Sequence, residues 1–265
     1  MFVNNMRLLI SVLFSCLLAA CQSRNIRSVN LGDGIRAEGR ITDDTTFDGV
    51  IKFYDGKTNQ LIEVGNYVNG IKSGADIIYY KNGTIASKAD FADGQQSGYS
   101  FNFDTSGKLV QKSNNYYGLN VGGSVNYIND SVKEFYFYDL DENILMYLDY
   151  DSIKGRRLGD IQPKFFFFHE SNYQPYDRHG VFHRYKSYFV YTPNPPKFDF
   201  KYSIVAIGSA YKILSVLNEI SNKQPWSIVN INWKPENPNQ HVALRLEVRD
   251  SINNKDMVAF KILRD

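Results

Sequence analysis

Residues 70–93 read GIKSGADIIYYKNGTIASKADFAD, and residues 94–117 read GQQSGYSFNFDTSGKLVQKSNNYY. The two stretches are adjacent and equally long, and a glycine opens each of them. In both, glycine recurs four and thirteen residues after the first one. A fixed period of 24 residues indicates an internal repeat in which each copy forms one structural unit.

The repeat extends to both sides of this stretch. Apolar and aromatic residues keep nearly the same spacing as the glycines. The apolar column is Leu61, Ile85 and Leu109, and the aromatic column is Tyr54, Tyr79, Phe103 and Tyr127. Columns of this kind predict that successive copies stack and share a core that a single copy could not form.

Each copy predicts a β-hairpin. Dipeptides that favour tight turns separate its strand-like segments, because glycine readily adopts the positive φ that such turns require. These are Asp55-Gly56, Asn82-Gly83 and Ser106-Gly107 at one end, and Asn69-Gly70 and Asp93-Gly94 at the other. Between two turns, Ile85, Ser87, Ala89 and Phe91 alternate with the period of a half-buried strand.

The pattern glycine, four residues, aromatic recurs at Gly49 to Tyr54, Gly74 to Tyr79, Gly98 to Phe103 and Gly122 to Tyr127. It resembles the bacterial variant of the MORN repeat, over residues 47–130. The resemblance implies an array of hairpins that offers a surface for interaction. Similar repeats occur in bacterial proteins labelled antitoxin-like, so it also implies a neutralising role toward a partner protein as an alternative.

The chain after the repeats predicts a second β domain. Residues 134–150 continue the strand pattern and would cap the array, and the charged residues 149–160 suggest a boundary. We therefore expect a repeat domain over residues 36–150 and a C-terminal domain over residues 151–265.

Seven strand-like runs follow, at residues 165–168, 188–191, 198–207, 211–217, 226–233, 242–248 and 257–263. Their number and spacing predict an immunoglobulin-like β-sandwich. Residues 211–220 admit a helix as an alternative, since Ile213, Leu214, Leu217 and Ile220 fit one helical face. The expected fold class is thus mainly β, with a hairpin array followed by a sandwich.

The N-terminal segment has the organisation of a secretory signal. Arg7 precedes a nearly unbroken apolar run over residues 8–20, which is shorter than a membrane span. The run ends in Leu18-Ala19-Ala20-Cys21, which resembles the bacterial lipobox. That resemblance implies cleavage between Ala20 and Cys21 and lipidation of Cys21, with residues 1–20 as signal peptide and residues 21–35 as a tether. A plain signal peptide or an uncleaved anchor is the alternative.

Lipidation would have chemical consequences. Cys16 would leave with the signal and Cys21 would carry the lipid, so the mature chain would have no free thiol and no disulfide. Several acyl chains on Cys21 would make the membrane a stable partner. Gln22 and Ser23 are not an acidic retention signal, so by resemblance we expect sorting to the outer membrane.

Charge and motifs limit the function. The chain has 30 basic and 28 acidic residues, which gives no global field to attract nucleic acid. No Gly-x-Ser-x-Gly motif and no phosphate-binding glycine loop is present. We therefore expect a protein that is not an enzyme and has no cofactor.

One cluster suggests metal chemistry. His169, Asp177, His179 and His183 are candidate zinc ligands, and a metal-dependent hydrolase built on them is an alternative function. The cluster contains no His-Glu-x-x-His motif, and Gly180 disfavours a helix, which favours solvated histidines instead. The acidic turn of Asp43, Asp44 and Asp48 lacks the spacing of a calcium loop.

The chain is rich in aromatic residues, with 19 Tyr, 18 Phe and 2 Trp. Many of them are needed for strands and core columns. Strand alternation must point others outward, and Tyr116, Tyr117, Tyr136 and Tyr138 are candidates for a surface that contacts a protein or a glycan. The sequence therefore predicts a lipid-anchored envelope protein with a binding or scaffolding role.

Overall fold

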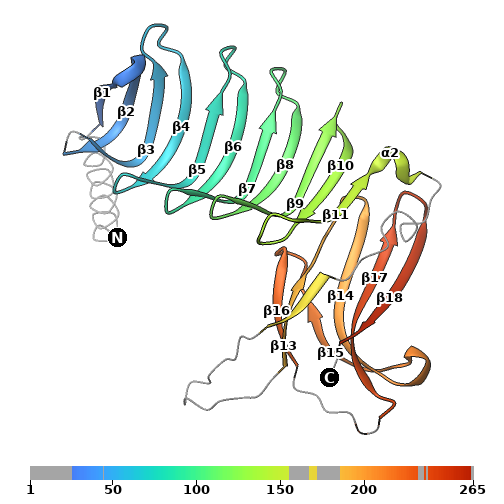
Figure 1. Cartoon of the computed structure of the whole chain (residues 1–265). Coiled ribbons are helices and arrows are strands. Elements are labelled where there is room, and N and C mark those ends of the chain that lie inside the picture. The colour runs from blue at the N-terminus through green and yellow to red at the C-terminus, as the bar shows by residue number, and fades with distance from the viewer. Residues whose placement is uncertain are drawn as a thin grey trace, which may run out of the picture. The chain divides into compact units, whose positions relative to one another are not determined.

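The computed structural model describes residues 26–43, 45–154, 167–171, 186–231, 236 and 238–263. Their regular structure is almost entirely β (Figure 1). Within this part of the chain, α2 (Tyr150–Ile153) is the one α-helix, and no helix is long and apolar enough to cross a membrane. The expected fold class, a hairpin array followed by a sandwich, is confirmed.

The strands of the array occur in the sheet in the order of the sequence, and the pairs whose register is defined are antiparallel. They are β1 (Ile26–Leu31), β2 (Ile35–Thr42), β3 (Thr46–Asp55), β4 (Leu61–Val68), β5 (Ile71–Tyr79), β6 (Ile85–Ala92), β7 (Gln95–Phe103), β8 (Leu109–Tyr116), β9 (Leu119–Ile128), β10 (Ser131–Tyr138) and β11 (Ile144–Asp149). This order is what a chain of short hairpins produces.

The turns fall where the sequence predicts them. Asn69 and Gly70 have φ angles of 49° and 82°, and the pair Asp93 and Gly94 repeats this geometry. Two consecutive positive φ angles are typical of the type I′ hairpin turn, whose twist matches that of the strands. The first copy differs at the opposite end, where Asn59 rather than Gly56 adopts the positive φ.

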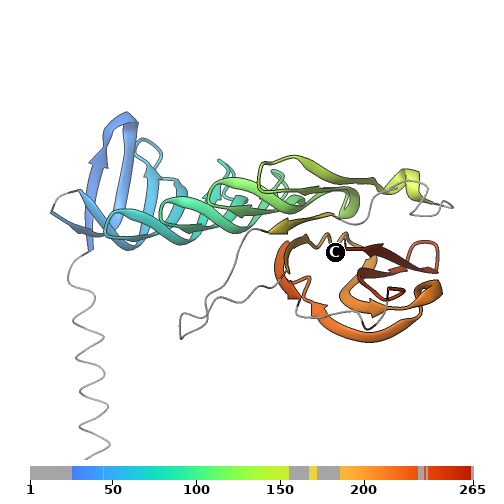
Figure 2. The ribbon, with the colours of Figure 1, turned by 60° about the horizontal axis from the view of Figure 1, so that its bottom comes forward.

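Hydrogen bonds from turn residues tie neighbouring copies of the first unit together. The amide of Gly70 donates to the Phe47 carbonyl at 2.8 Å, and the amide of Gly94 donates to the Lys72 carbonyl at 2.9 Å. At the other end, the Asn82 amide group donates to the Thr105 carbonyl at 2.7 Å. Recurrent bonds of this kind explain why the hairpins lie side by side in sequence order (Figure 2).

The N-terminal strand corrects the prediction of a tether up to residue 35. Residues 26–31 form β1, which pairs with β2 so that Val29 lies opposite Ala37. Val29 is half-buried and packs against the buried cluster of Ala37, Ile51 and Phe53, while the backbone of the segment pairs with β2. Residues 21–25 lie outside the described part of the chain.

The aromatic column of the repeat is only half-buried. Tyr54, Tyr79, Phe103 and Tyr127 keep part of their surface exposed, whereas Ala37 and Ile51 are fully buried. The aromatic column is therefore a half-buried row along the array. The buried apolar cluster of the first unit lies in β2 and β3.

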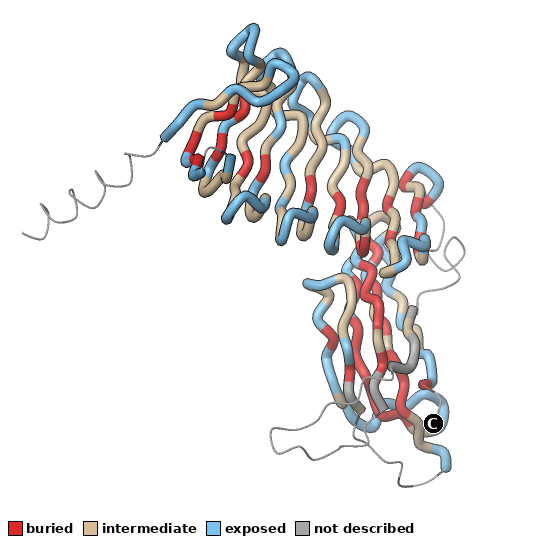
Figure 3. The backbone as a smooth tube through the Cα atoms, turned by 60° about the vertical axis from the view of Figure 1, so that its left-hand side comes forward, coloured by how far each residue is buried: buried red, intermediate tan, exposed pale blue. Residues whose placement is uncertain are grey.

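All seven predicted runs of the C-terminal domain are strands. They form two sheets, in the orders β12-β13-β16 and β15-β14-β17-β18. Their bounds are β12 (Phe167–Ser171), β13 (Lys186–Tyr191), β14 (Phe198–Ile207), β15 (Ile213–Ile220), β16 (Trp226–Ile231), β17 (His241–Asp250) and β18 (Lys255–Ile262). Buried residues are concentrated in β14 and β17, whereas β15 and β18 are mostly exposed. Figure 3 shows the buried residues along the backbone.

The strand order differs from that of the constant-type immunoglobulin domain. In that domain the fourth strand belongs to the same sheet as the first, second and fifth strands. Here the fourth strand, β15, pairs with the third, β14. The helix considered for residues 211–220 is wrong, because the segment from Ile213 onward forms this edge strand.

The structure divides into two compact units, residues 1–108 and residues 109–265. The second unit contains β8 to β11 as well as the C-terminal sheets. Phe135 and Phe137 of β10 and Met146 of β11 share one core with Phe200 and Leu244 of the sandwich. The last hairpins therefore pack as part of the C-terminal unit, while the domain boundary after residue 150 stays a prediction.

Candidate functional site

Three tyrosines gather on the face of β10 and β11 that is turned away from the core. In β10, Phe135 and Phe137 are buried, so Tyr136 and Tyr138 between and after them point to the opposite face. Tyr147 of β11 lies directly opposite Tyr136. The Tyr136 ring is 4.9 Å from the Tyr147 ring and 6.1 Å from the Tyr138 ring, between centroids.

A row of polar side chains borders these rings. Gln111, Asn126 and Glu134 are opposite one another across β8, β9 and β10. The Gln111 amide donates to Asn126 Oδ1 at 3.2 Å, and Asn126 Nδ2 donates to Glu134 Oε2 at 3.0 Å. The Tyr147 hydroxyl donates to Glu134 Oε1 at 3.2 Å. We call these six residues, Gln111, Asn126, Glu134, Tyr136, Tyr138 and Tyr147, the tyrosine face.

The phenols of this face are protonated at neutral pH. Burial, together with the charge of Glu134, raises the pKa of Tyr136 to about 12. Burial raises the pKa of Tyr138 and Tyr147 as well. The Tyr147 hydroxyl donates to Glu134 and can still accept a hydrogen bond from a ligand, and the carboxylate and amide oxygens beside the rings can accept others.

The other two predicted tyrosines form a separate cluster. The Tyr116 ring is 4.9 Å from that of Tyr117 and 5.2 Å from that of Trp226. Trp226 in turn stacks on Phe189, with 6.2 Å between the centroids. Tyr116 thus joins a chain of rings that leads toward the core, whereas Tyr136 and Tyr138 lie on the other face of the sheet.

Sequence reasoning missed Tyr147 and Trp226. The Asp139–Asn143 turn is visible in the sequence and places the two strands of the last hairpin opposite each other, which is a signal for Tyr147. Trp226 is 110 residues from Tyr116 in the chain, and no local pattern predicts their contact.

The first unit contains a partly buried ionic cluster that the sequence analysis also missed. Lys72 Nζ is 2.7 Å from Glu63 Oε1 and 2.8 Å from Asp76 Oδ1, and it lies 4.9 Å from the centre of the Phe91 ring. Burial raises the pKa of Glu63. Burial alone would lower the pKa of Lys72, but hydrogen bonds to Asp76 and Glu63 raise it above its usual value.

The repeat shows that these charges are peculiar to one copy. The positions 24 residues after Glu63, Lys72 and Asp76 are occupied by Ser87, Gln96 and Ser100. The next copy therefore fills the same place in the array with neutral polar groups. This comparison favours a structural role for the ionic cluster.

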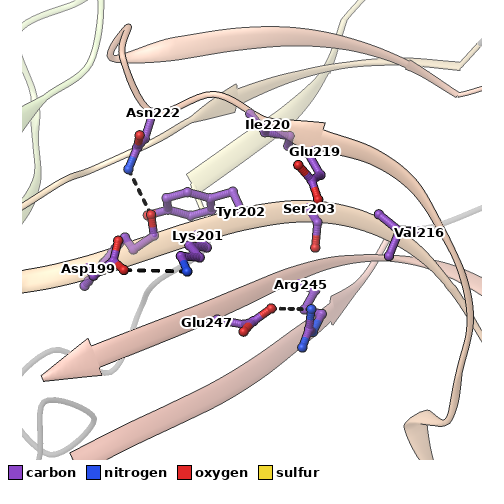
Figure 4. A pocket seen from close by; sticks show the side chains of 11 residues that line it. Asp199, Lys201, Tyr202, Ser203, Val216, Glu219, Ile220, Asn222, Arg245 and Glu247 are labelled. Carbon is purple, nitrogen blue, oxygen red and sulfur yellow. Dashed lines mark hydrogen bonds and ion pairs between the residues drawn. The ribbon is translucent and has the colours of Figure 1, made fainter.

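The outer face of the four-stranded sheet carries a cavity of about 440 Å³ (Figure 4). It lies over β14, β15 and β17, and its lining includes Lys201, Ser203, Glu219, Arg245 and Glu247. This volume is within the range of small-molecule sites. Charges of both signs line it.

The remaining predicted site residues are not brought together in the described structure. Ala20, Cys21, Asp177, His179 and His183 lie outside the described residues. The backbone of His169 is in β12, opposite Phe189. No group of three metal-ligating side chains occurs among the residues that the structure describes.

The acidic turn near the N-terminus is used in part for an ion pair. Asp48 pairs with Arg40, and Asp44 lies outside the described residues.

Comparisons with known proteins give little. No protein-family model and no curated protein matches the chain. A crystal structure of TarM matches 52% of this chain and 23% of its own length, with 12% identity and a TM-score of 0.28. A mutant of S. aureus TarM in complex with fondaparinux, alpha-GlcNAc-glycerol and UDP matches 51% and 23%, with 14% identity and a TM-score of 0.27. This chain spans less than a quarter of those proteins, and such a likeness supports no functional argument.

Proposed function

We propose that this protein is a lipid-anchored protein of the cell envelope that binds a glycan without transforming it, and that the tyrosine face is its binding surface. The observation that carries the proposal is the placement of Tyr136, Tyr138 and Tyr147 beside a continuous polar row on one sheet face. The envelope location rests on the resemblance of Leu18-Ala19-Ala20-Cys21 to a lipobox.

The chemistry of this face suits a sugar chain. A pyranose ring has apolar C–H surfaces and a rim of hydroxyl groups. Tyrosine rings supply flat apolar contact with little loss of side-chain entropy, and the Glu134 carboxylate and the Asn126 amide can exchange hydrogen bonds with hydroxyls. Glu134 and Asn126 are already fixed by bonds to each other, so binding costs little ordering.

The extent of the face favours a chain over a single sugar. The three rings occupy neighbouring places across β10 and β11, and the polar row continues over β8 and β9. A linear oligosaccharide can contact several of these groups at once, which offsets the weak contribution of each.

Binding of linear oligosaccharides to the purified protein, measured by calorimetry, tests the proposal. The panel includes neutral hexose chains and N-acetylhexosamine chains. Replacing Tyr136 or Tyr147 by alanine should weaken binding roughly tenfold, as expected for a lost aromatic contact of about 1.4 kcal/mol. Tyr99→Ala is the matched control, because Tyr99 is also exposed (47%) but lies in the first unit.

Three outcomes would contradict the proposal. If no oligosaccharide binds, or if Tyr136→Ala and Tyr147→Ala bind as tightly as the parent, the tyrosine face is not a glycan site. If envelope extract instead yields a protein whose capture depends on Tyr136, the face is an interface and the glycan assignment is wrong.

A further inference from the structure

The cavity of the C-terminal sheet is built by strand register. On the outer face, one row across the four strands consists of Glu219, Ser203, Arg245 and Phe260. Ser203 is the small member between the two charged ones, and Figure 4 shows Glu219 and Arg245 on opposite sides of it. The short serine leaves a hollow that a carboxylate borders on one side and a guanidinium on the other.

The rows on either side close the hollow. The next row toward one end consists of Val216, Val205, Ala243 and Ile262, and Val205 and Ala243 are fully buried. The next row toward the other end places Lys201 beside Glu247. Of the first of these two rows only Val216 lines the cavity, so Val216 borders one end of the cavity and Lys201 and Glu247 border the other.

Arg245, which lines this cavity, has an unused donor. Its Nη1 pairs with Glu247, and its side chain is 21% exposed. Among the described residues, no acceptor reaches its Nε, which is buried. A buried N–H without a partner is costly, so this position is suited to an acceptor from a ligand. A ligand carboxylate can accept a hydrogen bond from Nε along that edge of the planar guanidinium group.

The charges of the lining decide what accompanies that carboxylate. Arg245 is paired with Glu247, and Lys201 Nζ is 3.8 Å from Asp199 Oδ2. In the described part of the chain, no cation pairs with Glu219. The excess charge is therefore negative, which disfavours a simple anion. A ligand that carries a cationic group for Glu219 and a carboxylate for Arg245 satisfies both.

We propose that this cavity binds a small zwitterion, a free amino acid or a short peptide with unblocked ends. Its ammonium group contacts the Glu219 carboxylate, and its carboxylate accepts from Arg245 Nε. Ser203 forms the floor between them, and Val216 offers apolar contact to the side chain of the ligand. This site does not depend on the tyrosine face.

Calorimetric titration of the purified protein with L-alanyl-L-alanine, its N-acetyl derivative and its C-terminal amide tests the proposal. The unblocked dipeptide should bind, and each blocked form should lose about tenfold or more in affinity, as expected when a charged hydrogen bond is removed. Glu219→Gln should weaken binding of the unblocked dipeptide and abolish its advantage over the N-acetyl form. Arg245→Lys retains the charge but lacks Nε, and should abolish the advantage over the amide.

Glu134→Gln on the tyrosine face is the control, and it should leave dipeptide binding unchanged. Thermal unfolding of each variant verifies that it folds. The proposal is overturned if the dipeptide does not bind, if the blocked forms bind equally well, or if Glu219→Gln and Arg245→Lys bind like the parent.

Discussion

Tyr136 lies directly opposite Tyr147 in the β10–β11 ladder, and their ring centroids are 4.9 Å apart. Both rings are on the face opposite the buried Phe135 and Met146. The pair joins the two strands of the last hairpin and forms the centre of the tyrosine face, so we expect it to contribute to stability and to the proposed binding.

A double-mutant cycle should detect this ring contact. Tyr136→Ala and Tyr147→Ala, measured singly and together by urea unfolding, should show a coupling free energy of about 1 kcal/mol. Tyr136→Ala with Tyr99→Ala is the control pair, because the two residues belong to different units. Additive effects of Tyr136→Ala and Tyr147→Ala would show that the ring contact contributes nothing.

The raised pKa values predict alkaline destabilisation. Tyr136 has a folded pKa of about 12, above the unfolded value of about 10. The folded state then holds the proton more tightly than the unfolded state, so its contribution to stability is complete below pH 10 and is lost as the pH rises toward 12. Ultraviolet titration of tyrosine should show this group ionising about two units later than exposed tyrosines. Tyr136→Phe should remove that component, and an unchanged titration curve would contradict the assignment.

The ionic cluster of the first unit predicts a rescue by the neighbouring copy. Lys72→Gln alone leaves Glu63 and Asp76 without their cation and should cost about 2 kcal/mol of unfolding free energy, below the value for a fully buried pair because Lys72 is 22% exposed. Adding Glu63→Ser and Asp76→Ser copies the set Ser87, Gln96 and Ser100 and should recover most of the loss. Urea unfolding measures both. A triple variant as unstable as the single one would show that the charges are needed in this copy.

The turn geometry predicts a contrast between two glycines. Gly83 has a φ of 83°, and a side chain at this position would meet no atom within 4 Å, so Gly83→Ala tests backbone strain alone. It should cost about 1 kcal/mol, and Gly83→Asn should cost less. Gly32 has equal space and no positive φ, so Gly32→Ala should be nearly neutral. Equal thermal stability of Gly83→Ala and Gly32→Ala would refute this account of the turn.

The sequence predicted the features that depend on local spacing. Hairpins follow from recurrent glycines because each positive φ is set within a turn, as at Gly70 and Gly94. The seven C-terminal strands follow from alternation and turn residues. Residues 213–220 were ambiguous for a physical reason: register shifts leave Leu214 and Leu217 without a partner in β14, so the apolar residues lose their alternation and imitate a helical face.

The sites depend on register between distant strands. The row of Glu219, Ser203 and Arg245 comes from three strands, and the spacing of these residues in the chain has no pattern. The division of the four predicted tyrosines into two clusters depends on Trp226, which approaches Tyr116 from the sandwich. Composition alone could suggest exposed tyrosines, but not their neighbours.

The most direct test of the proposed function is an NMR titration. The tyrosine rings of the protein are selectively labelled, and the oligosaccharide that binds best in calorimetry is added stepwise. The account predicts that the signals of Tyr136, Tyr138 and Tyr147 shift together and saturate with one dissociation constant, while those of Tyr54 and Tyr79 stay in place. Shifts at Tyr54 and Tyr79, or saturation with Tyr136, Tyr138 and Tyr147 unchanged, would contradict it.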